Sequence, residues 1–201
     1  STSEIYSGSI KSNLIKFPTP EEQIITIPKL TDKRSSYLLS KIYGESLCLH
    51  SNIPIVIVRP HNIYGPRMGH SHVIPEIAKK VLSSKKSIIV FNPNHKRTFC
   101  FIDDFITALI LLMKKQKLKH NIFNIGNQYK EINMHNLALK IIKYYGLKNK
   151  IKKKEINNSS PKRRVPDITR LEKSTKFSNK FTLDQGLEKT LSWYKNYYQK
   201  N

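Results

Sequence analysis

The stretch Pro54-Ile55-Val56-Ile57-Val58 is followed at once by Arg59-Pro60-His61-Asn62-Ile63-Tyr64-Gly65-Pro66. A short, continuous apolar run is typical of a strand that is buried on both faces of a parallel sheet. The loop after it, Arg59–Gly69, is rich in proline and glycine. Because binding residues tend to lie on loops at the carboxyl ends of such strands, we expect an α/β fold with a functional loop here.

Outward from this strand, the pattern alternates between strands and helices. Ile5-Tyr6 predicts an earlier strand, and a helix is expected from about Ser35, which together give the βαβ rhythm of a doubly wound sheet. An aspartate, Asp103 or Asp104, is expected to cap a later helix. The other expected helices are Val73–Leu82, Leu137–Tyr145 and Leu183–Tyr198, and the other expected strands are Ser87–Phe91, Thr98–Ile102 and Asn121–Ile125.

The charge of the chain is extreme, since its 201 residues carry a formal net charge of +22. Such a value normally indicates a nucleic-acid or anionic membrane partner. However, 29 of the 36 basic residues are lysines, so an A/T-rich coding bias explains the charge without a polyanion. The chain has no zinc-finger, recognition-helix or RNA-binding aromatic pattern, and we expect no nucleic-acid partner. The run Lys152–Lys154 is interpreted as a solvated loop or an edge strand.

The two cysteines, Cys48 and Cys100, are isolated and have apolar neighbours. This context predicts buried free thiols in a reducing compartment and not a disulfide framework. The longest apolar run, Phe105–Met113, is too short to cross a bilayer. We therefore expect a cytoplasmic protein with no membrane partner, and we expect no metal site.

Tyr37 and Lys41 lie four residues apart in the helix expected from Ser35. Side chains at i and i+4 project from one face of a helix. A lysine ammonium beside a phenol favours the phenolate, so this pair could take a proton from a substrate hydroxyl. By itself the spacing is also that of an ordinary exposed tyrosine and lysine. A second pair, Tyr144 and Lys148, spans Gly146 at a helix end and is interpreted as coincidental.

Six short segments of the chain form a recognisable series. They are Ser1-Thr2-Ser3-Glu4-Ile5-Tyr6, Arg34-Ser35-Ser36-Tyr37-Leu38-Leu39-Ser40-Lys41, Arg59-Pro60-His61-Asn62-Ile63-Tyr64-Gly65-Pro66-Arg67-Met68, Arg97-Thr98-Phe99-Cys100-Phe101-Ile102-Asp103-Asp104, Phe123-Asn124-Ile125-Gly126 and Arg163-Arg164-Val165-Pro166-Asp167-Ile168. In this order the chain resembles the NAD-dependent epimerase/dehydratase family, the extended short-chain dehydrogenase/reductases that act on nucleotide sugars. The resemblance implies the C-terminal part of a Rossmann-like doubly wound parallel sheet with a small mixed α/β substrate-binding domain.

The resemblance implies catalytic roles for residues of the first two segments. These are Thr2, Ser3, Glu4, Tyr37 and Lys41. Thr2 would hydrogen-bond the sugar 4-hydroxyl, and Tyr37 would take its proton as a hydride leaves C4 for NAD⁺. Lys41 would hold the nicotinamide ribose and favour the phenolate of Tyr37.

The resemblance also implies which residues bind the cofactor and the substrate. Besides Tyr37 and Lys41, the cofactor-binding residues are Pro60, His61 and Ile63, on the loop that would pass the nicotinamide. Asn62 would reach the substrate, Arg97 and Arg164 would grip its diphosphate, Asp167 would bind ribose hydroxyls, and Phe91 would pack on the base. The guanidinium fork suits a diphosphate. The alternatives are that the two arginines are surface cations and that Phe91 is a core strand residue.

Glu4 bears on the choice of reaction. The Thr-Ser-Glu form looks like that of nucleotide-sugar 4,6-dehydratases and UDP-glucuronate decarboxylases. A 4-keto sugar acidifies its C5 proton, which a positioned carboxylate can remove as a base. Alternatively, Glu4 only accepts hydrogen bonds or caps a helix. We therefore expect a dehydratase or decarboxylase, with a 4-epimerase or a non-catalytic nucleotide-sugar-binding remnant as alternatives.

The phosphate-binding Gly-x-x-Gly-x-x-Gly turn of the family is not found in this sequence. The seven glycines never cluster in that way; they are Gly8, Gly44, Gly65, Gly69, Gly126, Gly146 and Gly186. We expect residues 1–66 to be the remaining part of the NAD-binding domain and 67–201 to be mainly the substrate domain, with some segments returning to the sheet. A chain that lacks this turn is expected to bind NAD poorly and to fold poorly. A homodimer is implied for the full-length form.

Overall fold

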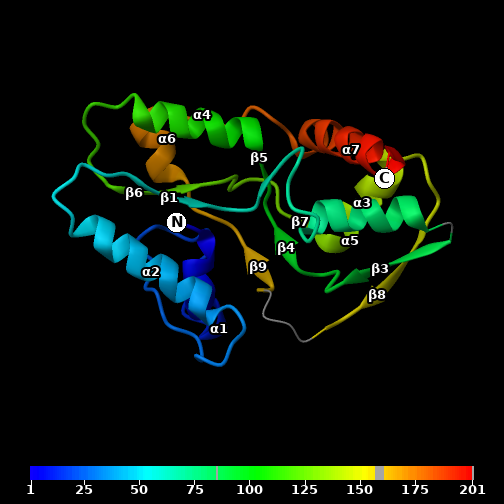
Figure 1. Ribbon diagram of the computed structural model, residues 1–201, viewed down its shortest axis with the longest axis horizontal. Helices are drawn as coiled ribbons and strands as arrows, with labels where there is room; N and C mark the ends of the chain where they lie inside the picture. The colour runs from blue at the N-terminus through cyan, green and yellow to red at the C-terminus, as the bar shows by residue number, and fades with distance from the viewer. Residues whose placement is uncertain (85, 157–160, 201) are drawn as a thin grey trace.

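Two groups of elements lie side by side in the computed structural model, which describes residues 1–84, 86–156 and 161–200 (Figure 1). The first group consists of η1 (Ser3–Tyr6), α1 (Ser7–Lys11), α2 (Ser35–Leu49), β1 (Ile57–Pro60), α4 (Ile102–Met113), β6 (Ile122–Ile125) and α6 (Thr169–Thr175). The second group consists of α3 (Val73–Ser83), β3 (Ser87–Phe91), α5 (Met134–Tyr144), β8 (Lys150–Lys154) and α7 (Leu183–Lys200). Short strands connect the two groups; they are β2 (Ile63–Tyr64), β4 (Lys96–Arg97), β5 (Cys100–Phe101), β7 (Ile132–Asn133) and β9 (Arg163–Arg164).

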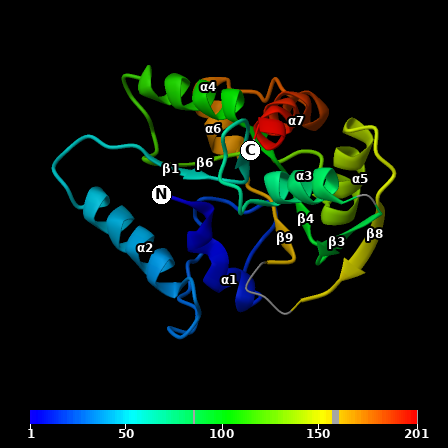
Figure 2. The ribbon, with the colours of Figure 1, turned by 45° about the vertical axis from the view of Figure 1, so that its right-hand side comes forward.

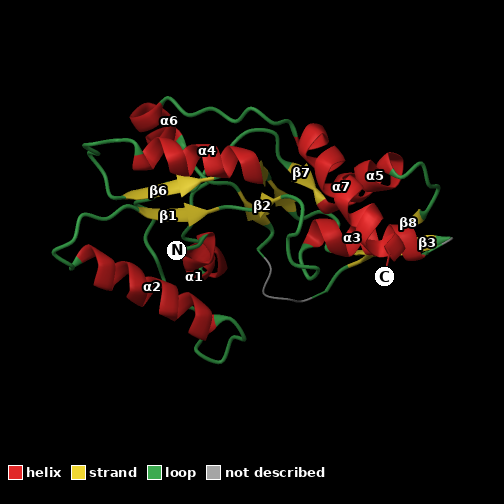
Figure 3. Ribbon diagram, turned by 45° about the horizontal axis from the view of Figure 1, so that its top comes forward, coloured by secondary structure: helices red, strands yellow, loops and turns green. Residues whose placement is uncertain are grey.

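Parallel pairing dominates the sheets, which confirms the expected α/β class. β1 pairs with β6 in parallel from Ile57 opposite Ile122 to Pro60 opposite Ile125, and β2–β5 and β3–β8 are also parallel. β4 pairs with β9 in parallel and with β7 in antiparallel orientation. Helices lie on both sides of β1 and β6, with α4 and α6 on one side and α2 on the other (Figure 3). This is the layering of a doubly wound sheet.

Each group of elements has an apolar core of its own. The core of the first group comprises Ala108, Leu112, Phe123, Ile125, Ile168, Leu171 and Phe177. The core of the second group lies between α3, α5, α7 and the strand β3, and it includes Ile74, Ala78, Val81, Leu137, Ile141 and Leu191, each fully buried. The helical spacing of apolar residues in the expected helices therefore marks the helix faces that pack into the core.

The expected strand at Ile5-Tyr6 is wrong, because these residues form the 3-10 helix η1. Thr2 has extended backbone angles, and its hydroxyl oxygen accepts the Glu4 N–H at 3.3 Å. This local hydrogen bond starts a helical turn where the apolar pair had indicated a strand. Ile5 and Tyr6 are still buried.

Three smaller expectations also differ from the structure. Neither Asp103 nor Asp104 caps α4; the Asp104 carboxylate instead accepts the backbone N–H groups of Lys180 and Phe181, which lead into α7. Cys48 is exposed on α2 and only Cys100 is buried, although both are free thiols as expected. The apolar run gives a strand at Ile57–Pro60, two residues later than expected.

The strand expected at Thr98–Ile102 is limited to β5, because α4 begins at Ile102. Several other expectations hold. β3 is found at Ser87–Phe91, α5 ends at Tyr144 just before Gly146, and the lysine run lies in the exposed strand β8. Gly146 has a φ of +66°, a left-handed conformation that glycine adopts without strain. Among the described residues, no helix is both long and apolar enough to cross a membrane.

Candidate functional site

A cavity of about 570 Å³ lies where η1, α2, the loop after β1 and β9 meet. Its lining consists of Thr2, Ser3, Glu4, Arg34, Tyr37, Pro60, Asn62, Ile63, Ser71, His72, Val73, Arg97, Pro161 and Arg164. Nine of the thirteen residues named from the sequence are in this set, although these nine come from five separate parts of the chain. Figure 2 shows β9, which carries Arg164, running between the two groups of elements.

The hydroxyl groups of the candidate site come from η1 and α2. Thr2 accepts the Glu4 N–H through its side-chain oxygen, which leaves the hydroxyl hydrogen as a donor toward the cavity. Tyr37 is 41% exposed, and the Lys41 ammonium lies 5.5 Å from the centre of its ring. The Arg34 guanidinium lies 5.7 Å from the same ring. Two cationic side chains thus lie against the face of the Tyr37 ring, whose negative potential attracts them.

Glu4 lies among arginines. One carboxylate oxygen of Glu4 accepts from Arg164 Nη2 at 2.9 Å, and the other lies 3.6 Å from Arg34 Nε and 3.5 Å from the Ser7 hydroxyl, which donates to it. Burial alone would raise the pKa of Glu4, but the charges of Arg164 and Arg34 outweigh burial and hold the pKa below its ordinary value. The carboxylate is therefore ionised at neutral pH.

Arg97 is buried beside Arg164 and donates to the backbone oxygens of Lys96 and Pro161. Burial, together with the positive charge of Arg164, lowers the pKa of Arg97 to about 10. Two guanidinium groups on adjacent strands thus face one cavity. This concentration of positive charge attracts an anionic ligand.

Asn62 has a φ of +46°, which is uncommon for a residue other than glycine. Its amide donates to the Thr98 backbone oxygen at 2.9 Å, so it ties the loop after β1 to the segment before β5. Asn62 also lines the cavity. The same side chain therefore has a structural contact besides the substrate contact expected of it.

Four of the residues named from the sequence do not line the cavity. The ammonium of Lys41 lies over the ring of Tyr37, which does line the cavity. Phe91 lies on β3, with the Lys80 ammonium 4.7 Å from its ring centre. One carboxylate oxygen of Asp167 accepts the Thr169 N–H at 2.8 Å, and the His61 ring is buried below the loop. The roles expected of these four side chains remain predictions.

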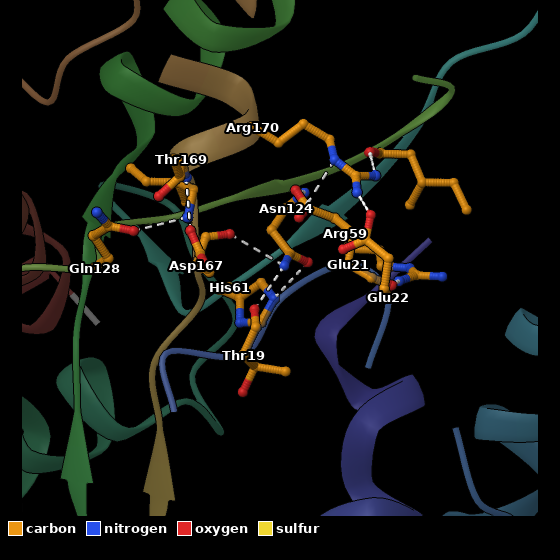
Figure 4. A network of polar contacts seen from close by, with 12 residues as sticks. Thr19, Glu21, Glu22, Arg59, His61, Asn124, Gln128, Asp167, Thr169 and Arg170 are labelled. Atoms are coloured by element: carbon orange, nitrogen blue, oxygen red, sulfur yellow. Dashed lines mark hydrogen bonds and ion pairs between the residues drawn. The ribbon is translucent and has the colours of Figure 1, made fainter. Parts of the chain in front are cut away.

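A buried polar network connects α2, η1, β1 and β6. Figure 4 shows the part of it around Arg59 and Asn124. Arg59, 3% exposed, donates to both oxygens of Glu45, at 2.9 and 2.6 Å, and to the Tyr6 hydroxyl at 2.7 Å. Tyr6 in turn donates to the Asn124 side-chain oxygen at 3.0 Å. Because Glu45 lies on the helix that bears Tyr37, the network fixes this helix against the strand pair.

His61 belongs to the same network. Its Nε2 lies 3.1 Å from the side-chain oxygen of Asn124, and the Asn124 amide nitrogen donates to the backbone oxygens of Thr19 and Asp167 (Figure 4). An amide oxygen only accepts, so His61 carries its proton on Nε2. Burial, and then the charges of Arg164 and Arg59, lower the pKa of His61 to about 3. The ring is neutral at physiological pH.

Sequence reasoning missed several residues of the site. Ser71, His72 and Val73 line the cavity from the start of α3, and Arg34 lines it just before α2. Arg34 begins the segment Arg34–Lys41 that carries part of the family resemblance, so its place in that segment could have identified it as a site residue. No local pattern distinguished Ser71, His72 or Val73.

Comparison with known proteins gives the family. The family model described as "NAD dependent epimerase/dehydratase family" matches residues 1–126. The chain belongs to this family. Members of the family depend on NAD, which agrees with the cofactor expected from the sequence.

Relatives within the family catalyse different reactions. The chain is 28% identical to a UDP-N-acetyl-alpha-D-glucosaminuronate decarboxylase of Bacillus cytotoxicus, over 97% of this chain and 62% of the relative. It is 31% identical to a dTDP-D-glucose 4,6-dehydratase of Dictyostelium discoideum, over 71% of this chain and 33% of the relative. A UDP-glucuronic acid 4-epimerase of Bacillus cereus, solved with UDP-glucuronic acid and NAD, superposes with a TM-score of 0.80 at 26% identity, over 98% of this chain and 60% of that one. The chain thus spans at most about 60% of the length of these proteins.

Proposed function

We propose that the cavity binds a nucleoside-diphosphate sugar and that the chain contributes the catalytic half of an NAD-dependent dehydratase or decarboxylase. The observation that carries this proposal is the convergence of Thr2, Glu4 and Tyr37 with Arg97 and Arg164 on one cavity. Hydroxyl and carboxylate groups suit proton transfer from a sugar, and guanidinium groups suit a diphosphate.

The residues at the cavity fit the nicotinamide end of NAD. A phenol with an ammonium group over its ring lies near the apolar side chains Pro60 and Ile63. NAD⁺, when bound, supplies the acceptor for the hydride that leaves C4 of the sugar. We propose that its phosphates are held by a Gly-x-x-Gly-x-x-Gly segment outside the 201 residues, with residues 1–66 completing that domain and 67–201 mainly binding the substrate.

In the proposed mechanism, Thr2 donates to the sugar 4-hydroxyl and orients it, and the Tyr37 phenolate takes the hydroxyl proton. Lys41, over the ring of Tyr37, stabilises the phenolate.

In a dehydratase, Glu4 would then remove the C5 proton, which the ketone at C4 has acidified, and would pass this proton to the C6 hydroxyl as that group leaves as water. In a decarboxylase, the C4 ketone would accept the electrons of the breaking C5–C6 bond as CO₂ leaves, and a proton would replace the carboxyl group at C5. In both cases the return of the hydride would complete the product, at C6 in a dehydratase (with a proton restored at C5) and at C4 in a decarboxylase.

Two further candidates have specific support. The likeness to a 4-epimerase favours simple inversion at C4. The two arginines at the cavity, Arg97 and Arg164, favour a protein that binds a nucleotide sugar without turnover, because they suit a diphosphate whether or not a hydride is transferred. We also propose a cytoplasmic location, since both cysteines are free thiols, and a homodimer formed through α2, whose outer face exposes Tyr43 and Leu47.

Product mass tests the proposed function. The chain, and a fusion that carries the NAD-binding segment of a family relative before Ser1, are incubated with NAD⁺ and UDP-glucose or UDP-glucuronate. Loss of water indicates a dehydratase, loss of CO₂ a decarboxylase, and a changed sugar of unchanged mass a 4-epimerase. Glu4→Gln should keep the oxidation at C4 and lose the dehydration. No product from either form, with nucleotide-sugar binding intact, favours the non-catalytic candidate.

A further inference from the structure

The Glu4 carboxylate holds a guanidinium that a substrate would need. Arg164 and Glu4 are 14% and 15% exposed, so their hydrogen bond of 2.9 Å is largely shielded from water. Arg34 contacts the other oxygen of Glu4 but is 60% exposed. Arg164 is therefore the principal partner of Glu4, and Arg34 is a weaker one because solvent screens it.

The arginines at the cavity have capacity for more than one carboxylate. Glu4 is the one acidic side chain in the described lining, whereas Arg34, Arg97 and Arg164 contribute three positive charges. Within the part of the chain that the structure describes, the Nε of Arg164 is buried and has no hydrogen-bond partner. A buried donor without a partner is costly, and an incoming anion could satisfy it.

We propose that Glu4 acts as a built-in anion on Arg164, and that an anionic group of the nucleotide sugar displaces it from that guanidinium when the substrate binds. This inference rests on the proposed function, because it requires the cavity to take a nucleotide sugar. The displacing group is the diphosphate or a carboxylate on the sugar, since both offer the paired oxygens that a guanidinium fork binds.

This exchange of partners on Arg164, from Glu4 to the substrate anion, would couple substrate binding to the pKa of the Glu4 carboxylate. The groups that face Glu4 are Arg164, Arg34, the Ser7 hydroxyl and, through its charge, Arg97. When Arg164 turns to the substrate, Glu4 loses its largest opposing charge while burial continues to raise its pKa. The carboxylate then becomes a stronger base at the moment when a C5 proton is within reach.

Calorimetric titration of the whole chain tests the exchange. UDP, UDP-glucose and UDP-glucuronate are titrated into the wild type and into Glu4→Gln at equal ionic strength. We expect Glu4→Gln to bind about tenfold more tightly, because the ligand no longer has to replace one charge-assisted hydrogen bond. Glu131→Gln is the matched control, since Glu131 pairs with the neighbouring Arg163 outside the cavity. It should leave all three affinities within about twofold of the wild type.

The three ligands distinguish the sources of the anion. If Glu4→Gln already binds UDP more tightly than the wild type does, the diphosphate is the group that displaces Glu4. If only UDP-glucuronate binds more tightly to the variant, the displacing group is the sugar carboxylate. Wild-type binding with an unchanged or weaker affinity in Glu4→Gln would overturn the exchange and leave the proposed function standing. Absence of binding in both forms would overturn both.

A second measurement uses the wild type alone, in case Glu4→Gln does not fold. The Glu4 carboxylate is titrated by carbon-detected NMR with and without saturating UDP-glucuronate. The exchange predicts a pKa that rises on saturation. An unchanged or lower pKa in the complex would mean that Arg164 stays on Glu4.

Discussion

Replacing Arg59 with Met should destabilise the chain far more than any change at a surface ion pair. Arg59 and Glu45 have side chains 4% and 7% exposed, and the variant leaves the Glu45 carboxylate buried without either of its two Arg59 hydrogen bonds. Tyr6 loses its donor at 2.7 Å in the same step. Removing one partner of a buried pair costs about 3–5 kcal/mol of the free energy of unfolding. The double variant Arg59→Met, Glu45→Leu should recover most of this loss, because no buried charge remains unpaired.

Urea denaturation followed by far-ultraviolet circular dichroism measures these free energies. Glu131→Gln is the control, because the Glu131–Arg163 pair is partly exposed and should contribute about 0–1 kcal/mol. If Arg59→Met loses its cooperative unfolding transition while Glu131→Gln keeps it, the result would agree with the larger loss of unfolding free energy expected for Arg59→Met. A loss in Arg59→Met no greater than in Glu131→Gln would refute the reasoning, since Arg59 would not then hold α2 in place.

Acid should destabilise the chain through His61, whose folded-state pKa of about 3 lies below its ordinary value. The unfolded chain therefore takes up a proton first, and stability falls by about 1.4 kcal/mol per pH unit below pH ~6 until the folded-state pKa is reached; His61→Gln should reduce this slope in urea titrations, and an identical slope would contradict the assignment. One thiol should react with Ellman's reagent in the native chain, because Cys48 is exposed while burial raises the pKa of Cys100 to about 12; two reactive thiols would contradict the burial of Cys100. Gly44→Ala should raise stability by about 0.5–1 kcal/mol, since α2 has open space there. Gly186→Ala should cost about 1–3 kcal/mol, because its Cβ would lie 2.0 Å from a buried phenol oxygen; similar urea midpoints for the two variants would be inconsistent with the packing.

Elements with a strong local pattern could be predicted from the sequence. The apolar run before Arg59 gave the parallel strand β1, although this strand covers only Ile57 and Val58 of the run. Val56 is 43% exposed, so the expectation of a strand buried on both faces is wrong. The pattern of the last helix gave α7 (Leu183–Lys200).

The error at Ile5-Tyr6 has a local cause. Two apolar residues resemble a strand end, but Thr2 two residues before Glu4 is a helix-start signal that should have taken precedence.

Contacts between distant parts of the chain could not be predicted in the same way. Tyr6 and Asn124 are 118 residues apart, and Glu4 and Arg164 are 160 apart. Only the resemblance to a family brought Glu4 and Arg164 into one predicted site, and it gave them separate roles without indicating that they pair. The Arg59–Glu45 pair went unnoticed because a charge within a strand carries no signal of its partner.

The most direct test of the central claim is a crystal structure of the chain with UDP-glucuronate. The account predicts the nucleotide sugar in the cavity between η1, α2 and β9, with its 4-hydroxyl within about 3 Å of the Tyr37 and Thr2 hydroxyls. Its anionic groups should contact Arg97 and Arg164. A ligand bound elsewhere on the chain, or one in the cavity with its sugar turned away from Tyr37, would contradict the account.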